Sequence, residues 1–165
     1  MSRIKKIVFA ALAAAALTGA AGAVHLDRPV QGSSSVSAGI QSSSAASEVV
    51  RLTNSARNKN GYAALVEDGA LSDAAAVRAR EIARSFSHTR PSGASFSSAL
   101  SESGVSYLRA GENIAYGQKS ASEVVNAWMN SPGHRANILN SSYSRIGSAS
   151  VNIDGTLYWV QLFAD

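Results

Sequence analysis

Three residues in the second half of the sequence could do chemistry together: His88, Glu112 and His134. Each histidine follows a segment that we expect to be helical, and the carboxylate lies beside a glycine in Gly111-Glu112-Asn113. Binding and catalytic residues are commonly carried on loops at the ends of such elements. Because neutral imidazole nitrogen and carboxylate oxygen both bind zinc, the three residues are a candidate divalent metal site. Water in a fourth position could then become a nucleophile.

The same residues allow a second mechanism that needs no metal. A histidine would act as the base, Glu112 would orient it, and a serine such as Ser131 would be the nucleophile. Both mechanisms depend on the fold, because none of these residues stands at a short metal-binding interval such as H-E-x-x-H. A third interpretation is structural, in which the histidines cap helix carbonyls and Glu112 pairs with Arg90 or Arg109.

The amino-acid composition excludes several other kinds of site. The sequence contains no cysteine, which rules out disulfides, thiolate metal sites and cysteine nucleophiles. Hydrophobic residues make up 45% of the chain and charged residues 16%, so a normal hydrophobic core can form. A domain of this length can be stable through side-chain contacts alone.

Residues 1–23 are predicted to be a signal peptide. Its parts are the basic residues Arg3, Lys5 and Lys6, the apolar run 7–17, and the small residues Ala21-Gly22-Ala23 before a cut at Val24. The apolar run is shorter than the roughly 20 residues that span a bilayer. We therefore expect cleavage and no transmembrane anchor in the mature protein.

Cleavage would change the charge balance. The whole sequence has a net charge of +4, but without residues 1–23 there are 12 basic residues against 11 acidic ones, a net charge of +1. A nearly neutral protein has no bulk electrostatic attraction for nucleic acid or for an anionic membrane. We therefore expect no nucleic-acid partner.

Residues 24–46 are predicted to be a flexible linker, because serine runs such as Ser33-Ser34-Ser35 and Ser42-Ser43-Ser44 can bury little apolar surface. The folded domain is expected at 47–165. Its apolar spacing predicts helices that begin at Ser47 and near Ser72.

Further along the chain, the order of elements is helices first and strands last. The second helix is expected to end near Phe86 and to leave Arg78 on its wet face, and a short helix is expected over 96–100. A capping box, Ser120-Ala121-Ser122-Glu123, predicts the start of another helix. Asp154-Gly155 between two apolar runs predicts a hairpin. These elements give an α+β fold in which helices cover a sheet.

Four motifs occur together and in order: Ser87-His88-Thr89-Arg90-Pro91, the segment 111–115 (GENIA), the segment 128–139 (WMNSPGHRANIL) and the segment 158–164 (YWVQLFA). In this combination the sequence resembles the bacterial secreted, SCP-like branch of the CAP superfamily (cysteine-rich secretory proteins, antigen 5 and pathogenesis-related proteins). The resemblance covers nearly all of residues 46–165.

The resemblance implies an α-β-α sandwich with a small antiparallel sheet between helical layers. It also implies a cleft lined by two histidines and acidic residues, in which His88, Glu112 and His134 match family positions. Asn113 and Asn137 are expected to brace loops by satisfying buried backbone groups. One position departs from the family, because many eukaryotic members have a second glutamate where this sequence has Ser131. With one acidic ligand fewer, metal affinity should be lower.

Two functions follow as expectations. The first is a secreted, monomeric binding module at the cell exterior, whose cleft takes a lipid, a cell-wall fragment or a protein. The alternative is a secreted hydrolase or peptidase, metal-assisted or serine-type, that uses His88, Glu112 and His134 with Ser131. A divalent metal such as zinc is the candidate cofactor in the metal-assisted case.

Overall fold

The computed structural model describes residues 34–165 of the chain, with side chains from Ala45 onward. The expected signal peptide, residues 1–23, and the first part of the expected linker, residues 24–33, lie outside the described residues. None of the helices within 34–165 has both the length and the apolar character that crossing a bilayer requires.

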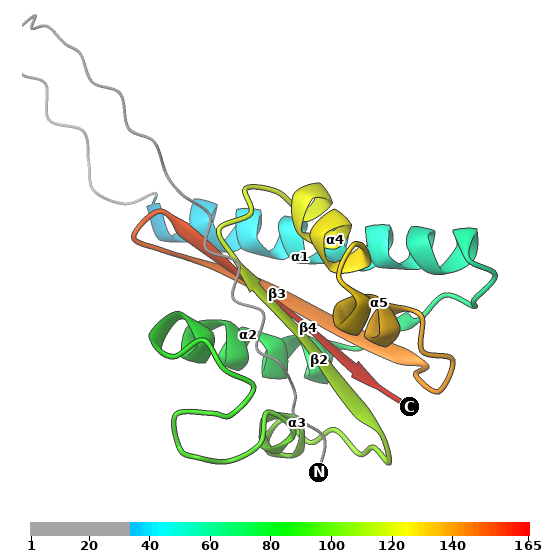
Figure 1. Ribbon diagram of the computed structural model, residues 1–165. Helices are drawn as coiled ribbons and strands as arrows, with labels where there is room; N and C mark the ends of the chain where they lie inside the picture. Colours follow the sequence, from blue (N-terminus) through cyan, green and yellow to red (C-terminus); the bar gives the residue numbers. More distant parts are fainter. Residues whose placement is uncertain (1–33) are drawn as a thin grey trace, which may run out of the picture. The chain divides into compact units, whose positions relative to one another are not determined.

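Five helices and four strands follow one another along the described residues (Figure 1). They are α1 (Ser34–Lys59), β1 (Val66–Glu67), α2 (Gly69–Arg84), α3 (Ser97–Glu102), β2 (Ala110–Tyr116), α4 (Ala121–Met129), α5 (Pro132–Ile138), β3 (Arg145–Ile153) and β4 (Thr156–Ala164).

The first helix begins well before its expected start. α1 starts at Ser34 rather than Ser47, so the C-terminal part of the segment expected to be flexible is helical. The buried residues Val49 and Val50 anchor this helix on the core. Once an anchored turn exists, each further residue adds one hydrogen bond at small cost, so the helix can extend backward through a serine- and alanine-rich segment.

The helix boundaries elsewhere follow local capping chemistry. α2 begins at Gly69 because the Asp68 side chain accepts a hydrogen bond from the Leu71 N–H at 3.0 Å. The predicted start of α4 is confirmed, since Ser120 Oγ accepts from the Glu123 N–H at 3.2 Å. The Glu123 carboxylate reaches back one residue further than in the usual capping box and accepts from the Lys119 N–H at 2.8 Å.

The sheet has the strand order β1-β3-β4-β2. The predicted hairpin is confirmed: β3 and β4 are antiparallel neighbours joined by Asp154 and Gly155, which both have positive φ, 50° and 79°. β2 pairs antiparallel with β4, whereas the short β1 runs parallel to β3. The sheet is therefore mixed, and not purely antiparallel as expected.

Helices cover both faces of the sheet, and the predicted α-β-α sandwich is confirmed. One cluster of buried side chains joins α1 and α4 to the sheet and contains Trp128, Trp159 and Phe163. The other joins α2 and α3 to the opposite face through residues such as Val160 and Leu162. Neighbouring residues of β4 belong to different clusters because side chains alternate across a strand. Figure 1 shows the two helical layers on either side of the strands.

We predict that Gly147→Ala will severely destabilise the fold. The backbone of Leu71 and Ser72 lies so close to Gly147 that a methyl group there would collide with it. Backbone of this kind cannot move aside cheaply, so the free energy of unfolding should fall by about 3 kcal/mol or more. Urea unfolding monitored by circular dichroism measures the change.

Gly69→Ala is the matched control. Gly69 lies on α2, the helix that Gly147 contacts, and nothing lies within 4 Å of a methyl group placed there. Alanine is also the better helix former, so stability should stay constant or rise by up to about 1 kcal/mol. Equal effects of the two substitutions would show that contact with α2 does not constrain Gly147.

Candidate functional site

Glu112 lies in the middle of β2, in a strand and not on the loop that the sequence suggested. It occupies the same strand face as Ile114, two residues later, which belongs to the cluster under α2 and α3. The Glu112 residue is only 4% exposed. A carboxylate buried this deeply needs partners for its charge.

Arg78 of α2 supplies the main partner. Its Nε lies 2.7 Å from Glu112 Oε1 and one of its terminal nitrogens lies 3.3 Å from Oε2. Both side chains are fully buried. The expectation that Arg78 lies on the wet face of its helix was therefore wrong, and so was the suggestion that Glu112 pairs with Arg90 or Arg109.

The sequence did contain a sign of the buried arginine. Arg78 follows Ala75 by three residues and precedes Ile82 by four, which places it on the stripe of α2 that faces the core. The small alanines around it leave room for a long side chain. An arginine in such a stripe indicates a buried acidic partner elsewhere in the chain.

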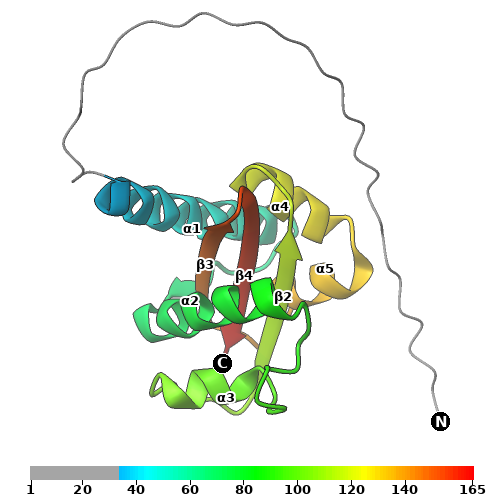
Figure 2. The same cartoon turned by 90° about the vertical axis from the view of Figure 1, so that its left-hand side faces the viewer.

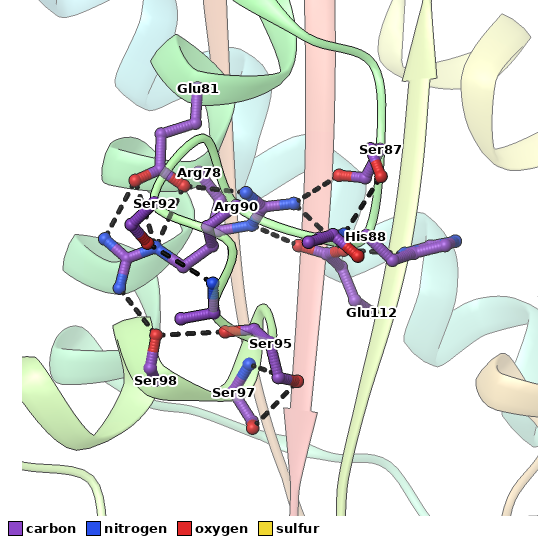
Figure 3. A network of polar contacts seen from close by, with 12 residues as sticks. Arg78, Glu81, Ser87, His88, Arg90, Ser92, Ser95, Ser97, Ser98 and Glu112 are labelled. Carbon is purple, nitrogen blue, oxygen red and sulfur yellow. Dashed lines mark hydrogen bonds and ion pairs between the residues drawn. The ribbon is translucent and has the colours of Figure 1, made fainter.

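A second set of contacts fixes the loop that carries His88 (Figure 3). Arg78 also donates to Glu81 and to the Ser87 carbonyl, each at 2.7 Å. Arg90 bridges Glu81 and Glu102 at 2.8 and 2.6 Å. Burial opposes the ionisation of Glu81, but the hydrogen bonds from Arg90 and Arg78 hold its pKa below the ordinary value.

His88 is brought directly to Glu112, as the cleft hypothesis requires. Its Nδ1 lies 2.7 Å from Glu112 Oε2, while its side chain is 57% exposed. Because the carboxylate accepts, Nδ1 carries the proton and Nε2 of the neutral ring remains a free acceptor. The contact thus orients an imidazole ring that is more than half exposed.

His134 lies on α5, which packs beside the outer edge of β2 (Figure 2). Asn113 donates to the His134 carbonyl at 3.2 Å. Asn137 donates to the Glu112 carbonyl at 3.2 Å and to the Asn113 side chain at 2.9 Å. The expected bracing role of both asparagines is confirmed, and they attach α5 to the strand that carries Glu112.

The environment of His134 favours its neutral form. Burial lowers the pKa of His134 below its ordinary value of 6.5, and charge on His88 lowers it further. The structure joins the side chains of His88 and Glu112 directly, and it attaches the backbone of His134 to the strand that carries Glu112.

Ser131 is the N-terminal capping residue of α5, but its side chain makes no capping hydrogen bond. No hydrogen bond joins its hydroxyl to either histidine in the part of the chain that the structure describes. The serine nucleophile thus remains a prediction, and the structure shows only the hydrogen bond between His88 and Glu112.

The three-ligand metal site also remains a prediction. Within residues 34–165, no group of three or more His, Cys, Asp and Glu side chains is arranged to hold a metal ion. Both Glu112 oxygens already accept, from Arg78 and from His88. The arrangement instead resembles that of metal-ligating histidines, which commonly donate their second ring nitrogen to a carboxylate.

The model of the CAP family, described as the cysteine-rich secretory protein family, matches residues 50–163. The chain belongs to this family. Its complete lack of cysteine shows that the fold of this CAP domain does not depend on disulfides.

Similar proteins come from several bacteria. The uncharacterized protein YkwD of Bacillus subtilis is 43% identical over 118 residues, which cover 70% of this chain and 45% of YkwD. A crystal structure of an extracellular SCP-domain protein from Bacillus anthracis aligns with a TM-score of 0.73 at 24% identity, covering 84% of this chain and 45% of that one. An outer surface protein of Borrelia burgdorferi aligns with a TM-score of 0.66 at 26% identity, covering 71% and 89%. The CAP chain described here thus spans less than half the length of YkwD.

We predict that Arg78→Met will be much more destabilising than its size change suggests. The substitution leaves the Glu112 carboxylate buried without its cation, and breaking a buried pair in this way costs about 3–5 kcal/mol. Arg80→Met on the same helix is the matched control, because Arg80 is exposed and its one hydrogen bond among the described residues is to the Ala76 carbonyl. Chemical denaturation of both variants compares the two losses, and similar small losses would show that the ion pair contributes little.

We also predict a stability change with pH that His134 causes. Because its pKa is lowered in the folded state, the unfolded chain binds a proton more readily, and stability is lost as pH falls from about 6.5 through the lowered value. When the pH falls from just above 6.5 to well below the lowered pKa of His134, the His134→Asn variant should lose less stability than the wild type. Urea midpoints of both proteins measure the difference, and parallel curves would contradict the assignment.

Proposed function

We propose that this CAP-domain protein is secreted and acts at the cell exterior as a monomeric binding module. Its cleft, formed by His88, Glu112 and His134, would take a lipid, cell-wall or protein ligand. The supporting observation is the hydrogen bond of 2.7 Å between His88 Nδ1 and the buried Glu112 carboxylate. It holds an exposed imidazole in one orientation, with Nε2 available to a ligand.

Several features support binding rather than turnover. The Glu112 carboxylate is occupied by Arg78 and His88, so it serves to orient a side chain and is not free to attack or to accept a proton from a ligand. The site also lacks the second family glutamate, where the chain has Ser131. The similar protein of Bacillus anthracis is described as extracellular, which agrees with the signal peptide predicted at residues 1–23.

Zinc is the candidate metal for this site. His88 Nε2 and the His134 ring are the groups that would hold zinc, and Glu112 would fix the ring of His88 from behind. Bound zinc would polarise a ligand carbonyl or lower the pKa of a water molecule. Two imidazoles with no direct carboxylate make a weak site, so zinc affinity should be modest.

A hydrolase is the second candidate, and the imidazole–carboxylate pair is the observation that favours it. His88 and Glu112 have the contact that a general base and its orienting residue make. Ser131 would need to approach His88 or His134 when a substrate binds. Glu112→Gln would then abolish turnover, whereas a binding module has no turnover to lose.

Co-sedimentation of the purified protein tests the proposed function. The partners are purified cell-wall sacculi and phosphatidylglycerol–phosphatidylcholine vesicles, and the variants are His88→Ala and His134→Ala. We expect the wild type to co-sediment with one of the two partners. Each variant should bind that partner at least several-fold more weakly, with little change in melting temperature. Thr89→Ala, at an exposed neighbouring position, is the control and should bind as the wild type does.

Zinc titration by calorimetry separates the metal-dependent case. Affinity at micromolar strength or better, lost in both histidine variants, would establish the metal site and justify assays of peptide hydrolysis. If the wild type binds sacculi or vesicles equally well with and without zinc, the result would support a binding module that needs no metal. Variants that melt earlier but bind normally would contradict the proposal and favour a structural role for the histidines.

A further inference from the structure

A row of polar side chains lies within the apolar layer that α1 and α4 cover. Asn113 of β2 and Ser148 of β3 both lie directly opposite Gln161 of β4 in the register of the sheet. Gln161 is on the same face of β4 as Trp159 and Phe163, which belong to the cluster under α1 and α4. Asn113 and Gln161 are 0% exposed. Polar groups buried in this way need hydrogen-bond partners, because each unpaired group costs free energy.

Asn113 and Gln161 belong to a hydrogen-bond network that joins α5 to α1. Asn137 of α5 donates to the Asn113 side chain at 2.9 Å, and Asn113 donates to the Gln161 side chain at 3.1 Å. Gln161 donates in turn to the Thr53 hydroxyl, and Thr53 donates to the Val49 carbonyl of α1 at 2.8 Å. Within residues 45–165, no buried nitrogen or oxygen of these side chains lacks a partner. The network therefore runs without a gap from α5, across two strands, to α1.

A backbone carbonyl fixes the orientation of the amides in this network. Asn113 donates to the His134 carbonyl at 3.2 Å, and a carbonyl can only accept, so the Asn113 nitrogen must face it. That nitrogen has two hydrogens, and the Gln161 oxygen accepts the other one. The Gln161 nitrogen is then directed at the Thr53 hydroxyl. A half-turn of the Gln161 amide would set its nitrogen against the nitrogen of Asn113.

The helix α5, which carries His134, depends on such polar contacts. It has seven residues, and Ile138 is the only one that is buried. A helix this short is not stable by itself, so other elements must hold it. At its C-terminal end, Arg57 of α1 donates to the Ile138 carbonyl at 2.7 Å. At its first turn, Asn113 holds the His134 carbonyl. α1 thus reaches both ends of α5, directly through Arg57 and indirectly through Thr53, one turn earlier on the same helix face.

We propose that Gln161 and Thr53 are positioning residues for His134. Neither contacts His134, and both act through Asn113: Gln161 keeps the Asn113 nitrogen turned toward α5, and Thr53 keeps Gln161 turned toward Asn113. A buried network whose members are all satisfied specifies one arrangement, whereas removal of one member leaves the others free to rearrange. This inference rests on the proposed function, in which His134 belongs to the binding site.

Nuclear magnetic resonance of the isotope-labelled protein tests the inference without any ligand. The variant Gln161→Met keeps a side chain of similar length but has no amide, so Asn113 loses one acceptor. The signals of the Asn113 side-chain amide and of the His134 carbonyl carbon and ring should shift or broaden. The ring signals of His88 should stay unchanged, because its contact with Glu112 lies on the opposite face of β2.

Thr53→Val and Thr53→Ser provide a matched pair that tests the same network if Gln161→Met does not fold. Valine lacks the hydroxyl that accepts from Gln161, whereas serine keeps it. Thr53→Val should therefore shift the His134 signals, and Thr53→Ser should leave them close to their wild-type positions. Ser148→Ala is the control for loss of a buried hydroxyl. Ser148 lies opposite Gln161 but donates to the Val160 carbonyl at 3.0 Å, outside the network, so this variant should not move the His134 signals.

Co-sedimentation with sacculi and with vesicles measures the consequence for binding. With the partner that the wild type binds, Gln161→Met and Thr53→Val should bind several-fold more weakly, as His134→Ala does. Thr53→Ser and Ser148→Ala should bind as the wild type does.

Two results would overturn the inference. Gln161→Met and Thr53→Val proteins that have a lower urea midpoint but wild-type His134 signals would give the network a purely structural role. Equal shifts in Ser148→Ala would show that loss of any buried hydroxyl has the same effect. If the wild type binds neither partner, the proposed function fails, and the His134 signals still decide whether Gln161 and Thr53 position this residue. Shifted signals with undiminished binding would uphold the positioning role and contradict the role of His134 in the binding site.

Discussion

The buried ion pair between Arg78 and Glu112 is the interaction on which the candidate site depends. Both side chains are fully buried, and their closest atoms lie 2.7 Å apart. A guanidinium and a carboxylate removed from water are stable only when each has its partner in good geometry. This requirement fixes α2 against β2 and at the same time orients the carboxylate that holds His88. Stability and site geometry therefore share one contact.

The two segments that carry the candidate histidines are attached to β2 by different means. On one side, charged groups hold the loop that carries His88, through Arg78 to the Ser87 carbonyl and through Arg90 to Glu81 and Glu102. On the other side, neutral amides hold α5, through Asn113 and Asn137. Among the ion pairs on the His88 side, only the Arg90–Glu102 pair has a largely exposed carboxylate, so salt should weaken that contact most.

The candidate site lies beside the edge strand β2, where the sheet would otherwise be open to pairing with another chain. An edge strand presents unpaired backbone groups that can join other strands. α5 and the indole of Trp128 cover the edge of β2 and satisfy the outward carbonyls of Glu112 and Ile114.

The sequence by itself determined the family, the α+β class, the capped start of α4 and the Asp154-Gly155 hairpin. Each of these depends on neighbouring residues, through capping, turn conformation or side-chain period. It also indicated His88, Glu112 and His134, because their motifs occur in a specific order.

Only the tertiary structure decided that Glu112 lies on an edge strand and that Arg78 is its partner. These two residues are far apart in the sequence, and local pattern carries no record of which buried charges meet. The early start of α1 was likewise decided by the anchoring of Val49 and Val50 in the core, since helix extension depends on the stability of the turns already formed.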